Sequence, residues 1–131
     1  MTPTTDMGLV RSILDRDDIA HGFYDGERAT DEQLNNLGLM YFYQEDVGLF
    51  VANISGKTLI FHAAIPKENR GKKAVNAAID LGKILLGAGY RVLTVQANKL
   101  HQRLFVKAVG FVYLRTDKKG MRWYFLPREV V

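Results

Sequence analysis

Apolar and polar positions near the start of the chain follow helical spacing. The four apolar residues of segment 9–14 fall on one face of a helix, and Thr5 or Asp6 precedes them as a candidate N-cap. Farther along, an Asp-Glu pair after Thr30 can open a second short helix. The pattern therefore predicts two short helices before residue 38.

Between residues 39 and 65 the pattern changes to that of strands. Segment 39–43 is rich in aromatic residues, segment 49–53 follows a turn at 45–48, and segment 58–65 follows the tight turn Ser55-Gly56-Lys57. Because the connections are this short, we expect the three strands to pair as an antiparallel meander.

The second half of the chain returns to the helical period. Between residues 73 and 86, polar residues recur on one side and apolar residues on the other, which predicts an amphipathic helix of about four turns. Gly87 and Gly89 end this helix. The elements expected after it are a strand at 91–97, a helix that ends at Gly110, and strands at 111–116 and 121–126.

This order of elements predicts the fold class. Three strands, a helix, a strand, a helix and two strands, after a helical start, indicate an α+β fold with one mostly antiparallel mixed sheet and a central βαβ unit. The chain has 131 residues, shows no linker and contains no internal repeat. We therefore expect residues 1–131 to form a single domain.

Composition removes several classes of protein and site. The chain has no cysteine, which excludes disulfides, thiolate metal sites and a cysteine nucleophile, and the acids of segment 15–46 are not spaced as a metal loop. No apolar run approaches the roughly 18 residues of a membrane span. The first residues lack the order of a secretory signal. We expect a cytoplasmic protein without a metal or a membrane partner.

Charge is divided unequally between the two halves. Residues 1–60 carry ten acids and four bases, a net charge of −6, whereas residues 61–131 carry four acids and fourteen bases, a net charge of +10. A half this basic usually meets an anionic partner, such as nucleic acid, a membrane surface or a phosphorylated small molecule.

The junction between the third predicted strand and the long helix carries the most chemistry. A strand that runs through a short basic loop into a helix points several free backbone N–H groups at one place, and the helix dipole adds positive charge there. Pyrophosphate suits such a pocket. A solvated basic surface is the alternative. The cations that would supply countercharge are Lys67, Arg70, Lys72 and Lys73.

The order and spacing of these features resemble the GNAT superfamily of N-acetyltransferases. The resemblance covers residues 58–126 and depends on the strand that ends before Pro66, the Arg70-Gly71 pair, the strand that ends before Asn98, and Gly110-Phe111. The chain is also similar to small GNAT-like proteins of tailed bacteriophages, in which His62, Pro66 and Arg70-Gly71 have counterparts. Such an origin would place it in the host cytoplasm.

The resemblance implies acetyl-CoA as co-substrate. In that family the strand matching 58–65 holds the pantetheine arm by backbone bonds, and the loop matching 70–75 wraps the pyrophosphate. Backbone donors near Ala64 and Ile65 would stabilise the developing oxyanion. Asn98 would bond the pantetheine chain or cap a helix. The implied cofactor-binding residues are Ala64, Ile65, Arg70, Gly71, Lys72, Lys73, Ala74, Val75, Asn98 and Arg103.

Two departures from the family pattern matter for activity. Lys73 and Val75 stand where the family loop has small residues, chiefly glycine, that let the backbone approach the pyrophosphate. Many members also place a tyrosine about four residues before Gly-Phe, to protonate the leaving thiolate. Here that neighbourhood holds Phe105 and Val106, which cannot donate a proton.

Histidine supplies the candidate general base. His62 lies in the strand that would flank the acetyl group, where an imidazole could take a proton from an amine directly or through water. The alternative is a half-buried histidine that is hydrogen-bonded within the sheet. For His101 a capping or surface role is the more natural interpretation, and for Arg103 a solvated helix face is the equal alternative.

The leading hypothesis is an N-acetyltransferase that transfers the acetyl group directly to an unidentified amine, either a small molecule or a protein. The acids of segment 15–46 would suit a cationic amine or form a soluble face. The alternative is an inactive GNAT-shaped protein with a structural or interaction role, for example in a phage virion. Nucleic-acid binding is the third and weakest hypothesis. A homodimer is one option for the assembly.

Overall fold

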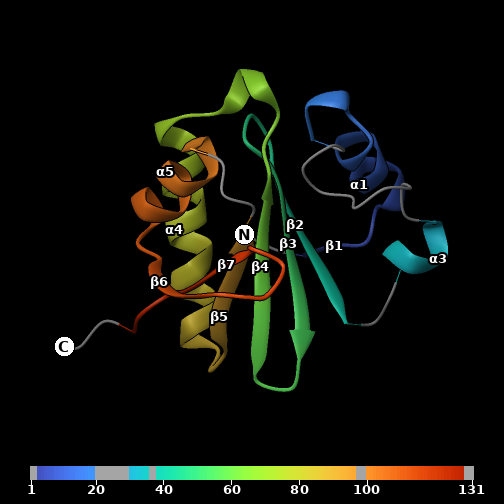
Figure 1. Ribbon diagram of the computed structural model, residues 1–131. Helices are drawn as coiled ribbons and strands as arrows, with labels where there is room; N and C mark the ends of the chain where they lie inside the picture. Colours follow the sequence, from blue (N-terminus) through green and yellow to red (C-terminus); the bar gives the residue numbers. More distant parts are fainter. Residues whose placement is uncertain (1–2, 20–29, 36–37, 97–99, 129–131) are drawn as a thin grey trace.

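Seven strands form one sheet with helices on both of its faces (Figure 1). The computed structural model describes residues 3–19, 30–35, 38–96 and 100–128. The strand order in the sheet is β1-β2-β3-β4-β5-β7-β6, and the only parallel pair within the described part is β4 with β5. The predicted α+β class, with a mostly antiparallel mixed sheet, is confirmed.

The N-terminal layer includes two short helices, α1 and α3, that lie on one face of the sheet (Figure 1). Helix α1 (Met7–Leu14) begins after Asp6, whose Oδ1 accepts the N–H of Leu9 at 3.1 Å. Helix α3 (Asp31–Leu34) begins with a capping box between Thr30 and Gln33. Both predicted helices are present, because each combines a capping side chain with a buried apolar face. Strand β1 (Pro3–Thr4) pairs with β2 and was not predicted.

The predicted meander is confirmed as strands β2 (Leu39–Gln44), β3 (Gly48–Ser55) and β4 (Thr58–Ala64), each antiparallel to the next. The middle strand β3 is buried on both faces. Its residues Phe50 and Ala52 belong to the core under α4, whereas Leu49 and Val51 belong to the core under α1. The alternation of a strand therefore separates two apolar cores, one on each side of the sheet.

The βαβ unit follows the meander. Helix α4 (Lys72–Gly87) connects β4 to the parallel strand β5 (Arg91–Gln96), and its residues Ala74, Ala78, Leu81 and Leu85 are buried against the sheet, as the periodicity predicts. A 3-10 turn, η1 (Lys67–Asn69), precedes α4 and was not predicted.

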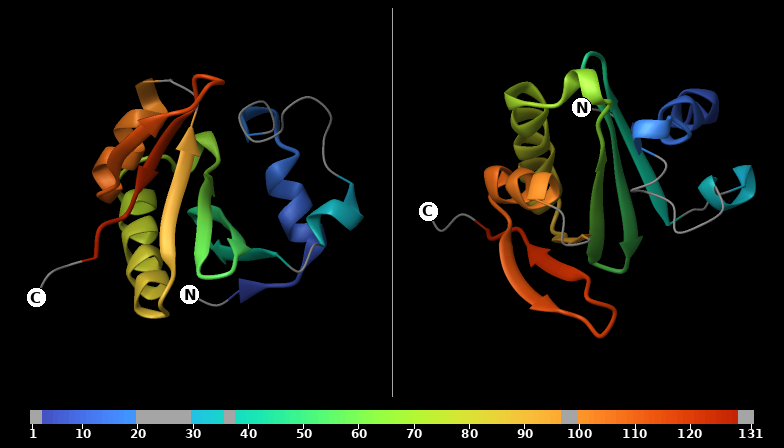
Figure 2. Two further views of the ribbon diagram at one scale, coloured as in Figure 1. Left: turned by 60° about the horizontal axis from the view of Figure 1, so that its bottom comes forward. Right: turned by 45° about the horizontal axis from the view of Figure 1, so that its top comes forward.

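Helix α5 (Leu100–Val109) lies beside α4 on the same face, and the chain ends in the hairpin β6 (Val112–Thr116) and β7 (Arg122–Phe125). Strand β7 pairs with β5, so β6 becomes the outermost strand, and the hairpin forms one edge of the sheet in both views of Figure 2. The hairpin was predicted, but its insertion in the order β5-β7-β6 was not.

Candidate functional site

The two parallel strands separate near their carboxyl ends. Paired residues run from Thr58 with Arg91 to Ile60 with Leu93, although β4 continues to Ala64 and β5 to Gln96. At the point of separation the buried Thr94 donates from Oγ1 to the carbonyl of Phe61 at 2.7 Å. The last residues of β4 and β5 are therefore not paired with each other, and we call the unpaired stretch between these strand ends the opening.

Backbone alternation identifies which groups face this opening. Because the carbonyl of Phe61 accepts a bond from β5, the N–H and C=O groups of Phe61 and Ala63 point toward β5. The neighbouring Ala64 is opposite Leu49 of β3 and is buried in the core under α1. Ala63 was not among the residues predicted from sequence, since that prediction did not assign which edge each residue presents.

Close packing against β3 shapes the corner at the end of β4. Gly48 has φ +146°, and a Cβ there would come within 2.7 Å of the Ala64 carbonyl and 2.8 Å of the Pro66 ring. Asn69 adds a second contact, because its Nδ2 donates to the Val47 carbonyl at 3.2 Å. The chain that leaves β4 is therefore held closely against the start of β3.

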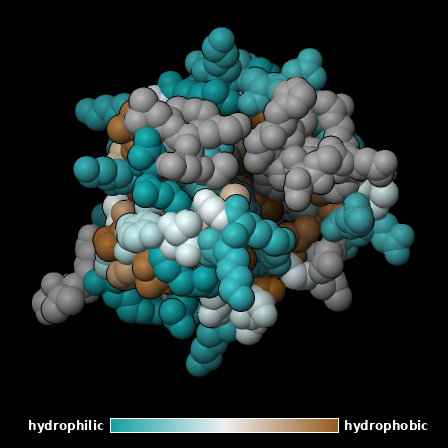
Figure 3. Space-filling view, in the orientation of Figure 1, coloured by the Kyte–Doolittle hydropathy of each residue, from teal (hydrophilic) through white to brown (hydrophobic). Residues whose placement is uncertain are grey.

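The start of α4 lies beyond this corner and has the features expected of an anion site. Gly71, the N-cap residue, has φ +145°, and the helix has no capping side chain and no acid in its first turn. The first N–H groups of a helix have no partner within it. Lys72 and Lys73 are exposed beside these N–H groups. The surface over this junction, at the top of Figure 3, is hydrophilic.

Two of the predicted positions in this turn face inward. The amide of Val75 donates to the Gly71 carbonyl at 3.1 Å, so the open amides are those of Lys72, Lys73 and Ala74. The side chains of Ala74 and Val75 pack against the core under α4. Lys73 reaches toward the turn before β3, where its Nζ lies 3.9 Å from the carboxylate of Asp46.

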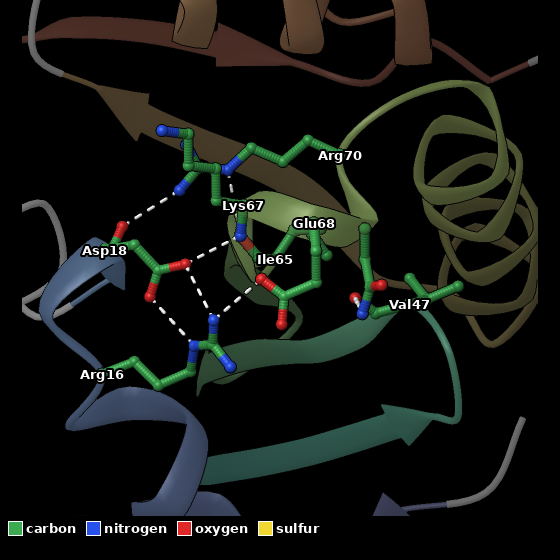
Figure 4. Close-up of polar contacts among 8 residues, drawn as sticks. Arg16, Asp18, Val47, Ile65, Lys67, Glu68 and Arg70 are labelled. Carbon is green, nitrogen blue, oxygen red and sulfur yellow. Dashed lines mark hydrogen bonds and ion pairs between the residues drawn. The ribbon is translucent and has the colours of Figure 1, made fainter.

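The guanidinium of Arg70 contacts the protein itself. Its Nε donates to the Ile65 carbonyl at 3.1 Å, and its terminal nitrogen donates to the Asp18 carbonyl at 3.0 Å. These bonds use two of the five N–H groups of the side chain. Arg70 therefore bridges the end of β4 and the N-terminal layer (Figure 4).

Asp18 is the centre of a polar cluster at this bridge (Figure 4). Its carboxylate accepts both Arg16 Nε, at 2.9 Å, and the backbone N–H of Lys67, at 2.7 Å. Arg16 also donates to Glu68 at 2.8 Å. Together, the hydrogen bond from Arg16 and the bond from the Lys67 amide lower the pKa of Asp18 to about 2. Sequence reasoning missed this cluster, because no local pattern connects residues 16–18 with residues 67–70.

His62 lies on the face of the sheet that carries α1, two residues before Ala64 and opposite Val51. Its side chain is partly buried, and burial lowers the pKa of the imidazole. A lowered pKa favours the neutral form, which is the form that can accept a proton. Both interpretations of His62, as a base and as a histidine of the sheet, are compatible with this position.

Strand β5 and helix α5 both contain buried polar atoms without partners. Within the described part of the chain, Oε1 of Gln96, Oε1 of Gln102 and Nε of Arg103 are buried and form no hydrogen bond. Alternation places Gln96 on the same face as Thr94, toward α4 and α5. Buried groups of this kind normally have a partner, so they suit a polar ligand. Asn98 lies outside the described residues.

The acids of the N-terminal layer bind arginines of the same layer. Arg11 contacts Asp15 at 3.5 Å and Asp31 at 2.8 Å, in addition to the pair formed by Arg16 and Asp18. Across the described ranges, no three His, Asp or Glu side chains come together as a metal site. None of the helices in those ranges has the length and apolar content needed to cross a bilayer.

Comparison with known proteins finds a solved structure with a similar fold. No model of a known protein family matches the chain, and no curated protein sequence matches it. A solved structure of a Bacillus subtilis acetyltransferase in complex with CoA matches it with a TM-score of 0.65 at 15% sequence identity. The match covers 96% of this chain and 95% of that one. The mixed seven-stranded sheet with a parallel β4–β5 pair therefore matches the fold of that acetyltransferase, and the predicted GNAT-like fold is confirmed.

Proposed function

We propose that this chain is an acetyl-CoA-dependent N-acetyltransferase that transfers the acetyl group directly to an amine. One arrangement carries the proposal: strands β4 and β5 separate after Ile60 and Leu93, and the opening leads to an uncapped, basic helix start. The similarity of the fold to an acetyltransferase solved with CoA supports placing CoA in this opening.

The opening offers polar groups that fit a pantetheine arm. Phe61 is already bonded to Thr94 of β5, so the backbone groups of Ala63 are those that face the space between the strands, and an extended amide chain can pair with them as an added strand would. The unpartnered atoms of Gln96 and Arg103 lie on the side of α5 and would gain partners from the amide or phosphate groups of the ligand.

The start of α4 fits the diphosphate. The amides of Lys72, Lys73 and Ala74 supply donors, the helix dipole supplies roughly half a positive charge, and the two lysines add countercharge. The replacement of a family glycine by Val75 does not obstruct this place, because the Val75 side chain packs against the core. Lys73 is exposed, so its flexible side chain can turn toward a phosphate.

Acetyl transfer to an amine forms an N–C bond, breaks the C–S bond of the thioester, and moves one proton from the amine to the leaving sulfur. His62 is the residue we assign to accept the amine proton, directly or through water, since burial keeps its imidazole neutral. The N–H of Ala64, which was predicted from sequence as a donor, points toward β3, so the backbone N–H groups of Ala63 and Ile65 are the proposed donors to the carbonyl oxygen of the acetyl group. The amine would enter from the α1 side, where His62 lies.

Calorimetric titration with CoA and acetyl-CoA tests the proposal. We expect both to bind, and we expect K73E to weaken binding about tenfold, because a positive charge at the helix start becomes negative. The matched control is K83E, which makes the same charge change on an exposed residue near the other end of α4. No binding at millimolar ligand, or equal losses in both variants, would exclude the proposed site.

An interaction role without catalysis is the alternative, and strand β6 favours it. All five residues of this edge strand are exposed, among them the large apolar residues Val112, Tyr113 and Leu114. Sedimentation over a range of concentrations would reveal self-association, and persistence of that association in K73E would separate it from CoA binding. A homodimer, a phage origin and a cytoplasmic location stay predictions from sequence.

A further inference from the structure

Asp18 contacts both ends of the loop between β4 and α4, and also an arginine of its own layer. Its carboxylate accepts the backbone N–H of Lys67 and the guanidinium of Arg16, and its carbonyl accepts the guanidinium of Arg70. Arg16 in turn donates to Glu68, the residue after Lys67. One residue of the N-terminal layer thus holds the loop both at its first residue and at the residue just before Gly71 (Figure 4).

The same loop is supported independently from the other side. Gly48 allows β3 to pack against the Ala64–Pro66 corner, and Asn69 donates to the Val47 carbonyl. These contacts come from β3 and involve no charged group. The contacts on the side of the N-terminal layer are charged or charge-assisted, and such bonds are shorter and stronger than neutral ones.

We propose that Asp18 is a positioning residue that holds the Lys67–Gly71 loop so that the amides at the start of α4 converge on the diphosphate of CoA. This inference rests on the proposed function. Arg70 belongs to the same device, because its bonds to the carbonyls of Ile65 and Asp18 fix the approach to Gly71. Through this cluster the layer expected to face the amine also controls the loop expected to bind the cofactor.

The cluster contacts each end of the loop through a direct hydrogen bond. The N–H of Lys67 is the first loop amide after Pro66, and its bond to Asp18 fixes the start of the η1 turn. The other end of the loop is fixed by Arg70, the residue before Gly71. With both ends held, the backbone at Gly71, with its positive φ, keeps one conformation. The N–H groups of Lys72 and Lys73 therefore point toward the diphosphate site before a ligand binds.

Substitution of Asp18 separates positioning from folding. D18N keeps an oxygen for the Lys67 amide but loses the charge that pairs with Arg16, whereas D18A loses both. We expect CoA affinity to fall about threefold in D18N and about tenfold in D18A, because one and then two charge-assisted bonds are lost. D80N is the matched control, since Asp80 is exposed on α4 and makes the same charge change.

Hydrogen exchange at individual amides supplies the readout that a loss of global stability would not produce. We expect faster exchange at Lys67 in D18A, with unchanged exchange in β3 and β4. E68Q, which alters an exposed side chain of the cluster, should give the same change on a smaller scale.

The two proposals can fail separately. If the wild-type protein does not bind CoA, the proposed function fails, and the exchange at Lys67 still reports whether Asp18 holds the loop. If the wild-type protein binds CoA and D18A binds it equally well, or if exchange rises evenly throughout the sheet, the positioning role is wrong.

Discussion

Two basic regions of the molecule differ in what their charges do. The junction between β4 and α4 and the hairpin of β6 and β7 each carry four cations: Lys67, Arg70, Lys72 and Lys73 in the first, and Arg115, Lys118, Lys119 and Arg122 in the second. At the junction the lysines of α4 surround helix amides that have no capping side chain. In the hairpin, Arg115, Arg122 and Asp117 all have partners within the hairpin itself.

In the hairpin, both arginines have aromatic partners within the same two strands. Arg115 lies over the ring of Trp123 and Arg122 over that of Tyr113, each 5.3 Å from the ring centroid. Asp117 accepts the indole N–H of Trp123 and the backbone N–H groups of Lys119 and Met121. Positive charge alone therefore does not define an anion site, and the accompanying open backbone groups distinguish the junction.

The largest expected difference between the two regions is the loss of unfolding free energy when a glycine is replaced by alanine. Alanine at Gly48 would combine an unfavourable φ with contacts of 2.7 and 2.8 Å, so we expect G48A to lower the free energy of unfolding by about 3 kcal/mol. Gly120 in the hairpin turn has φ +80° but open space around it, so G120A should cost about 1 kcal/mol. Chemical unfolding of both variants measures the difference. Equal losses would show that the corner at the end of β4 is not closely packed.

A smaller effect is expected for the indole of the hairpin. W123F removes the donor to Asp117 and should lower the free energy of unfolding by about 1 kcal/mol. CoA affinity should stay within about twofold of the wild-type value, because the hairpin has no part in the proposed site. Thermal unfolding and calorimetry measure the two quantities. A large loss of CoA affinity would extend the site to the hairpin.

The smallest expected effect is the loss of folding stability when two carboxylates, Asp18 and Asp117, are protonated in acid. The pKa of Asp18 is lowered to about 2, first by the hydrogen bond from Arg16 and then by that from the Lys67 amide, and the Trp123 indole lowers the pKa of Asp117. A carboxylate whose pKa is lower in the folded than in the unfolded state stabilises the fold at pH values above its ordinary pKa of 3.8. That contribution is lost as the pH falls from about 4 through about 2.

Carboxyl chemical shifts followed by NMR between pH 5 and pH 2 measure the pKa of Asp18 directly. We expect Asp18 to titrate near the bottom of that range. A pKa for Asp18 close to the ordinary value of 3.8 would show that the cluster around Arg16 does not persist in solution.

The same comparison shows which parts of the molecule could be predicted from sequence. Periodicity predicted the long helix correctly, because α4 buries one stripe that includes Ala74, Ala78 and Leu81. Local turn chemistry likewise predicted the meander and the closing hairpin. The insertion of β7 between β5 and β6 was not predicted, since strand order depends on long-range pairing that no local pattern records.

The candidate site was predictable only where it is local in sequence. The basic loop and helix start at Arg70 to Val75 are one continuous segment, so their composition could be recognised. The partners of Arg70 could not, because Asp18 lies 52 residues away in the chain. Gly48 looked like an ordinary turn residue, and only the contact distances to Ala64 and Pro66 show its role.

Amide chemical shifts on addition of CoA test the central claim most directly, since they compare both basic regions in one measurement. We predict the largest changes at Phe61 and Ala63 and at Lys72 to Ala74, with the hairpin residues 115–122 unchanged. Changes confined to the hairpin, or no changes at millimolar CoA, would contradict the assignment of the cofactor site to the junction of β4 and α4.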